Sequence, residues 1–191
     1  MEVKEKIITC LRSTNRVGID NLLFWMEQNG FYDAPCSSRY HLAKRGGLAE
    51  HSLNVFKNAI SIIEPLYVKE GKELKPSFID SVAICSLLHD LGKTGQFGKR
   101  NYIERNEDHP EYNFKPFEYN KDLLYVPHEV RSIAIASQFI DLSEEEQFAI
   151  LYHNGLYGEL KSIRGNETEL YMILHFADMW ASRVTEKEEA Q

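Results

Sequence analysis

Apolar residues recur at helical spacing along most of this 191-residue chain. That spacing gathers them on one face of an α-helix, whereas a half-buried strand would alternate apolar and polar residues. Pro76 is suited to a first helical turn and Gly92 to a C-terminal cap, while Ser143 and Glu146 have the spacing of a capping box. We therefore predict an all-α fold with helices over residues 3–11, 19–27, 48–63, 76–88, 128–140, 143–152 and 168–183.

The helical pattern is interrupted between residues 93 and 127. Two short apolar segments, 102–103 and 123–126, are separated there by prolines and charges, so we predict a short β-hairpin or an ordered lid. Pro65 should end or kink the third helix, and the charged tail from Glu186 should fray. No linker or repeat divides the sequence, which predicts a single domain over residues 1–191.

Charge and composition restrict the class of protein. The formal net charge of −7 argues against the basic surface that a long nucleic acid requires, but it allows a small phosphorylated substrate. The three cysteines lack zinc-type spacing, which favours reduced thiols. Since no apolar segment is long enough to span a bilayer and the N-terminus has no signal-peptide core, we expect a cytoplasmic protein with no membrane partner. The sequence predicts no particular oligomeric state.

Histidines and aspartates fall where several helices could bring them together. Taken singly, each has an ordinary explanation as a core histidine or a paired acid. Asp178, however, lies inside an apolar helix, where a buried carboxylate is costly unless a cation compensates it. The adjacent pair His89-Asp90 can approach one ion together. We predict a metal site, and the six candidate ligands would be enough for two divalent ions that share a carboxylate: His51, His89, Asp90, His128, His153 and Asp178.

The order of these residues resembles that of the HD-domain superfamily of metal-dependent phosphohydrolases. The segment 46–52 is similar to the one that carries the first metal histidine in HD-domain 3′–5′ exoribonucleases of Gram-positive bacteria. Residues 89–93 resemble the central motif of the superfamily and residues 174–178 its last motif. The resemblance covers residues 41–183, with the two N-terminal helices of residues 1–30 outside it, and two further histidines make it similar to the dinuclear subclass.

This resemblance implies roles for individual residues. One ion would be held by His51, His89, Asp90 and Asp178, and Asp90 would bridge to a second ion at His128 and His153. The ions could be Mn²⁺, Fe²⁺, Co²⁺, Ni²⁺ or Zn²⁺, and a metal-activated hydroxide would attack phosphorus. We predict Asp90 and Lys93 as catalytic residues. The candidates for binding the substrate phosphate are Lys93, His41, Arg45 and Arg131, although an ordinary polar loop or a pairing with an acid explains the last three equally well.

The predicted reaction is hydrolysis of a phosphate ester or anhydride in a nucleotide or short oligonucleotide. A 3′–5′ nuclease would use the same chemistry but needs a basic, aromatic groove for the strand. A di-iron oxygenase of the HD type has a similar ligand order and would consume oxygen. A nucleotide sensor without turnover is the third alternative, and the complete ligand set disfavours it.

Overall fold

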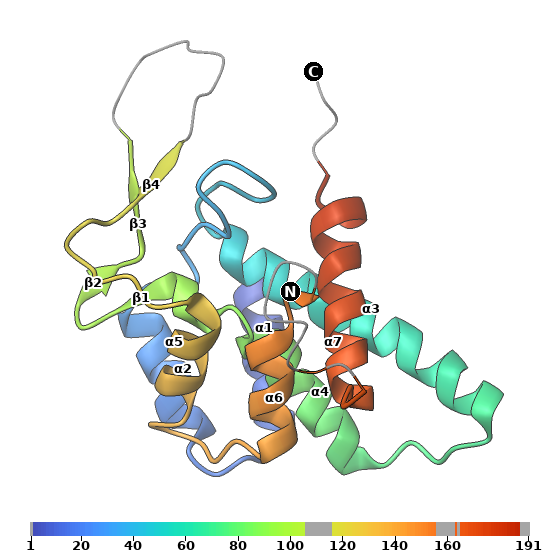
Figure 1. Ribbon diagram of the computed structural model, residues 1–191. Coiled ribbons are helices and arrows are strands. Elements are labelled where there is room, and N and C mark those ends of the chain that lie inside the picture. Colours follow the sequence, from blue (N-terminus) through green and yellow to red (C-terminus); the bar gives the residue numbers. More distant parts are fainter. Residues whose placement is uncertain (1, 106–115, 156–162, 164, 188–191) are drawn as a thin grey trace.

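Seven α-helices make up most of the described chain in this computed structural model, which describes residues 2–105, 116–155, 163 and 165–187 (Figure 1). The prediction of a mostly helical fold is confirmed. In chain order the helices are α1 (Val3–Ser13), α2 (Ile19–Gln28), α3 (Gly47–Glu70), α4 (Pro76–Leu88), α5 (His128–Ala136), α6 (Glu144–Tyr152) and α7 (Glu169–Trp180).

The core is built around α4, which packs against α3, α6 and α7. Every residue from Val82 to Leu88 is buried, so the second half of this helix has no face left for solvent. Buried apolar side chains from Ile7 in α1 to Ala181 after α7 join it in one cluster. The residues that directly follow α4 therefore lie in the interior of the bundle.

The interruption before α5 contains the β-structure of the described chain. After a short 3₁₀ turn, η1 (Leu91–Thr94), strand β1 (Gly95–Gln96) pairs with β2 (Lys99–Arg100), and β3 (Tyr102–Glu104) pairs with β4 (Phe117–Tyr119), all antiparallel. The β3–β4 ribbon projects from the helices at the upper left of Figure 1. The predicted hairpin is confirmed.

The position of its second strand was predicted wrongly. The partner of Tyr102 is Tyr119, with ring centroids 5.0 Å apart, and no strand forms at the described residues 123–126. The two tilted rings favour this segment because directly opposed aromatic residues stabilise an antiparallel pair. Residues 106–115 of the insertion, with Pro110, Tyr112 and Phe114, lie outside the described residues.

Two local predictions at helix ends have opposite outcomes. The capping box of α6 is confirmed, because Ser143 Oγ accepts from the amide of Glu146 and the Glu146 carboxylate accepts from the amide of Ser143. Of the two outcomes expected at Pro65, an end or a kink, the end is wrong, since α3 continues to Glu70 and is capped by Gly71 in the left-handed region (φ 64°). Among the described helices, no segment combines the length and the apolar character needed to cross a membrane.

An ion pair between the partly exposed Arg16 and the buried Glu146 ties the α1–α2 turn to α6. The Glu146 carboxylate receives two hydrogen bonds from Arg16, of 2.6 and 3.0 Å. Burial would raise the pKa of Glu146, but Arg16 and the Ser143 amide outweigh it and lower the pKa. We expect Glu146→Gln to reduce the free energy of unfolding by roughly 2–3 kcal/mol at neutral pH, because Arg16 loses its charged partner.

The pH dependence of this effect follows from the direction of the shift. A carboxylate with a lowered pKa in the folded state contributes its full stabilisation above the unfolded value of about 4.3 and loses it as the pH falls through the folded pKa. Denaturant unfolding of both proteins from neutral to acidic pH should therefore show their difference shrinking. The exposed neighbour Glu145 provides the control Glu145→Gln, with little change expected. A difference independent of pH would contradict the assignment to the ion pair.

Candidate metal centre

Five helices bring the six predicted ligands to one place. His51 lies in the second turn of α3, His89 and Asp90 directly follow α4, and His128 is the first residue of α5. The remaining two are His153, which caps the C-terminus of α6, and Asp178, which lies inside α7. Histidine and aspartate side chains that are far apart in the sequence therefore meet because helix ends converge.

The Gly-Gly turn before α3 sets the position of His51. Gly46 has a φ of 76°, in the left-handed region, and a Cβ on Gly47 would lie 2.0 Å from the carbonyl oxygen of Leu42. A side chain at either position would strain or push apart the turn that starts the helix. The two glycines thus allow the loop before α3 to pack directly against the helix that carries His51.

Asp90 lies at the centre of the cluster and faces imidazoles with each of its oxygens. Its Oδ1 is 3.1 Å from His128 Nε2 and 3.6 Å from His153 Nε2. Its Oδ2 is 3.6 Å from His51 Nε2 and 3.5 Å from His89 Nε2. Two pairs of imidazoles therefore share one buried carboxylate, with a different oxygen directed to each pair.

The backbone orients two of the histidines. His89 Nδ1 lies 3.0 Å from the carbonyl oxygen of Ser86, and His153 Nδ1 lies 2.7 Å from that of Ile150. A carbonyl oxygen can only accept, so Nδ1 carries the proton in both rings. The lone pair of each Nε2 is then directed at the cluster, as a metal ligand requires.

His51 is oriented by a carboxylate that the sequence did not predict. Glu186 places its two side-chain oxygens 2.9 and 3.1 Å from His51 Nδ1, and it also accepts from Asn54. Asp178 Oδ1 lies 3.1 Å from the other ring nitrogen of His51. The expected fraying of the tail is wrong at Glu186, because the π-helical turn η4 (Ala181–Thr185) directs this residue into the interior. Residues 188–191 lie outside the described chain.

Three buried or nearly buried carboxylates lie around His51, namely those of Asp90, Asp178 and Glu186. Burial would raise the pKa of Asp90, but Lys93 and the neighbouring imidazoles outweigh it and hold the pKa well below its usual range. The same balance of burial against His51 lowers the pKa of Asp178. Burial would lower the pKa of Lys93, yet Asp90, at 2.6 Å from its Nζ, raises it. The site therefore brings ionised carboxylates together with an ammonium and several imidazoles in the interior.

The donor set fits divalent metal ions. Asp90 Oδ1 is buried and accepts no hydrogen bond from any described residue, although His128 Nε2 is close. Candidate ligand atoms lie within 4.8 Å of one another in the group His51, His89 and Asp90, and in the group Asp90, His128 and His153. Imidazole nitrogens and carboxylate oxygens at such separations are the ligands that Mn²⁺, Fe²⁺, Co²⁺, Ni²⁺ and Zn²⁺ accept.

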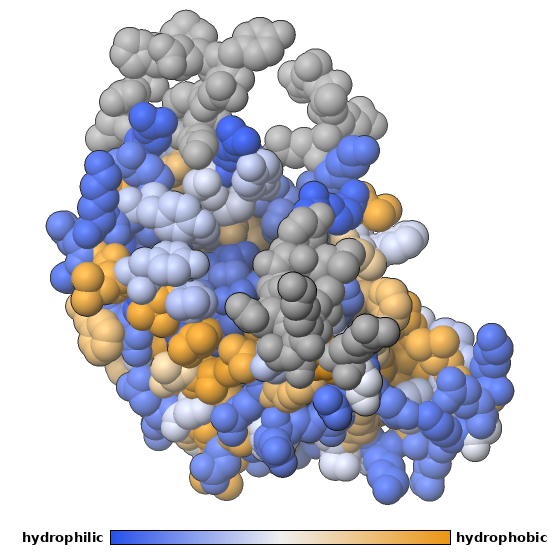
Figure 2. All heavy atoms as spheres, in the orientation of Figure 1, coloured by the Kyte–Doolittle hydropathy of each residue, from blue (hydrophilic) through white to orange (hydrophobic). Residues whose placement is uncertain are grey.

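A cleft of about 1140 Å³ opens over this cluster. Asp90, Lys93, His153 and Asp178 form part of its wall, and Arg39, Tyr40 and Arg183 also line it. Hydrophilic side chains predominate on the face shown in Figure 2. The cleft is large enough for a molecule the size of a nucleotide.

The four residues predicted to bind substrate lie in different places. Lys93 and His41 line the cleft. Arg45 is exposed and pairs with Glu104, and it borders a smaller pocket beside the β-ribbon. Arg131 is buried, and its guanidinium donates to Gln96 and to the carbonyl oxygen of Leu124, which ties α5 to the insertion. These contacts give Arg45 and Arg131 structural partners away from the cleft.

The sequence was compared with known proteins. No family model matches the chain. It is 28% identical over 187 residues to dihydroneopterin 2′,3′-cyclic phosphate phosphodiesterase of Methanocaldococcus jannaschii. The alignment covers 97% of this chain but 65% of that relative, so the chain spans slightly less than two thirds of its length. No solved structure matches.

The contact between Glu186 and His51 should strengthen metal binding. A carboxylate on the outer nitrogen of a metal-binding histidine fixes the ring and raises its basicity, so Glu186→Ala should weaken metal binding by about 10–100-fold. The control is Glu50→Ala, which removes an acid next to His51 in sequence that pairs instead with Lys44. Metal affinity measured by competition with a chelator checks both variants. Equal affinity in the two variants would show that Glu186 does not support the site.

Proposed function

We propose that this chain is a metal-dependent phosphodiesterase of the HD type that hydrolyses a small nucleotide-like phosphodiester, such as a 2′,3′-cyclic phosphate. The division of the Asp90 oxygens between two pairs of imidazoles carries this proposal. A carboxylate in that position can bridge two ions, which is the arrangement expected from the resemblance to dinuclear HD-domain proteins. The similarity to a cyclic phosphate phosphodiesterase supports the substrate class.

The ligand assignment follows the two sides of Asp90. One ion would be held by His51, His89, Asp90 and Asp178, and the other by Asp90, His128 and His153. Two divalent ions supply Lewis acidity for the phosphoryl oxygens and an activated water at neutral pH. We propose that the protein holds the ester over the cluster, with its phosphate facing Asp90 from the cleft.

Lys93 is the residue of this chain best placed to act on the phosphate. Its side chain is partly exposed to the cleft, and its ammonium is held by Asp90. Its ammonium can balance negative charge on phosphorus and donate a proton to the leaving oxygen. Opening a cyclic phosphate consumes one water and leaves a phosphomonoester on one of the two oxygens.

The test is a comparison of substrates on chelator-treated protein that has been reloaded with a single metal. Phosphorus NMR should show the ring of nucleoside and pterin 2′,3′-cyclic phosphates opening only when metal is present. A labelled single-stranded oligonucleotide should remain intact. Shortening of the oligonucleotide from its 3′ end without ring opening would establish the nuclease alternative instead. Oxygen consumption with iron but no phosphate chemistry would establish the oxygenase.

A further inference from the structure

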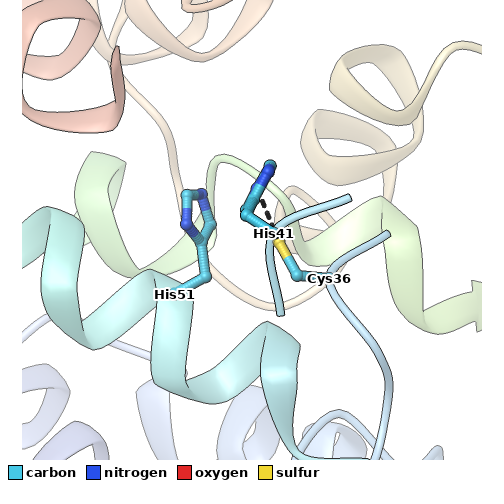
Figure 3. A group of neighbouring side chains, drawn as sticks. All are labelled: Cys36, His41 and His51. Atoms are coloured by element: carbon cyan, nitrogen blue, oxygen red, sulfur yellow. Dashed lines mark hydrogen bonds between the residues drawn. The ribbon is translucent and has the colours of Figure 1, made fainter. Parts of the chain in front are cut away.

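The loop that precedes α3 brings two more metal-binding side chains to the centre. Cys36 and His41 both come from this loop, and their side chains converge beside His51 (Figure 3). Cys36 Sγ lies 3.4 Å from His41 Nε2, and one candidate ligand atom from each of the three residues lies within 4.8 Å of the others. The HD resemblance assigns no metal ligand to Cys36 or His41.

Hydrogen bonds within the loop before α3 hold it in the conformation that brings Cys36 and His41 together. The amide of Cys36 donates to the carbonyl oxygen of Leu42, and Ser37 Oγ donates to that of His41. Leu42 itself has a φ of 48°, a left-handed conformation that costs free energy for any residue with a Cβ. Backbone strain of this kind persists where the surrounding contacts fix it, and it is concentrated at functional positions.

The separation of the two side chains suits a shared cation. Ligands at about 2.3 Å for sulfur and about 2.0 Å for nitrogen from a tetrahedral Zn²⁺ lie about 3.5 Å apart. The observed distance between Cys36 Sγ and His41 Nε2 is 3.4 Å. Cys36 is fully buried, and its Sγ also lies 4.0 Å from Asp90 Oδ2. Coordination of a cation fits a buried thiol that lies beside an imidazole and a carboxylate.

We propose that Cys36 and His41 hold an additional thiophilic divalent cation, Zn²⁺ or Co²⁺, next to the two-metal cluster. Cys36 and His41 are its protein ligands, and Glu186, whose Oε2 lies 4.0 Å from His41 Nε2, adds a negative charge beside it, while His51 stays with the two-metal cluster. The cysteine proton is released to solvent when the cation binds. Lys93 Nζ, 4.0 Å from Cys36 Sγ, favours the resulting thiolate.

This cation has a position and a preference that differ from those of the cluster. The six ligands assigned to the cluster include no sulfur, although Cys36 Sγ lies 4.0 Å from Asp90 Oδ2. A thiolate selects Zn²⁺ or Co²⁺ over Mn²⁺ or Mg²⁺. A cation bound by Cys36 and His41 beside Glu186 would also fasten the loop before α3 to the turn after α7. It would thereby fix one wall of the cleft, because His41 and Glu186 both line it.

Cobalt provides a direct readout of the thiolate. Chelator-treated protein is titrated with Co²⁺ under anaerobic conditions, and the near-ultraviolet band of thiolate-to-cobalt charge transfer is recorded. We expect the band in the wild-type protein and its loss in both Cys36→Ser and His41→Gln. Zinc bound per chain should fall by one in the same variants. Cys10→Ser is the matched control, since it removes a thiol on α1, outside the cluster, and the band should be unchanged.

Two outcomes would overturn the proposal. Absence of the band in the wild-type protein would leave Cys36 and His41 as a thiol–imidazole hydrogen bond, and a band that survives Cys36→Ser would assign it to another cysteine. His41→Gln keeps the test open if Cys36→Ser does not fold, because His41 is partly exposed. This test can fail independently of the proposed hydrolysis. His128→Ala should abolish turnover and retain the band, whereas loss of the band in Cys36→Ser does not require loss of turnover.

Discussion

Asp90→Ala should remove most of the bound metal at both positions of the cluster and lower turnover by more than about 100-fold. This loss is larger than the loss expected when a residue that only hydrogen-bonds to a metal ligand is removed. The physical reason is that this one carboxylate faces all four imidazoles, two with each oxygen. Without it, the like-charged ions would have no shared anion between them. Elemental analysis of protein purified without oxygen, together with the cyclic phosphate assay, measures both effects.

The matched control for this variant is Asp80→Ala, which removes a carboxylate near the other end of α4. Metal content and turnover should remain at the wild-type level there. Retention of two ions per chain in Asp90→Ala would show that Asp90 does not bridge, and the dinuclear assignment would then be wrong.

His153→Ala should deplete chiefly one of the two ions. His153 Nε2 lies on the Oδ1 side of Asp90 with His128, whereas His51 and Asp178 lie on the other side. The remaining ion should keep the ligands His51, His89, Asp90 and Asp178. Turnover should fall by more than about 100-fold, because in-line attack needs both ions to stabilise the attacking and leaving oxygens.

The reciprocal variant His51→Ala distinguishes the two positions. It should deplete the other ion while the ligands His128 and His153 stay in place. Loading each variant with Co²⁺ and recording its visible spectrum, which differs with coordination geometry, identifies which ion remains. Identical spectra and stoichiometry for the two variants would contradict separate ligand sets.

Much of the helical fold could be predicted because it depends on local pattern. Apolar spacing located each helix of the described residues, and the capping box of Ser143 and Glu146 marked the start of α6. One error arose where a partner distant in sequence decided the outcome: the second strand of the ribbon lies at residues 117–119, where Tyr119 lies opposite Tyr102. At Pro65 the helix does not end, and α3 continues to Glu70. The division into a single domain over residues 1–191 stays a prediction.

Residue type and helix position in the sequence determined which side chains could bind metal. His89 and Asp90 follow an apolar helix, and Asp178 lies inside one, so the local pattern alone implies burial and the cost of an uncompensated charge. Only the tertiary structure decided how these side chains are arranged around Asp90, whose two oxygens face different pairs of histidines. It also placed Glu186, by way of the turn after α7, against His51. Next to them it brought Cys36 into contact with His41. No local pattern encodes these contacts, because each depends on where the ends of separate helices meet in the packed bundle.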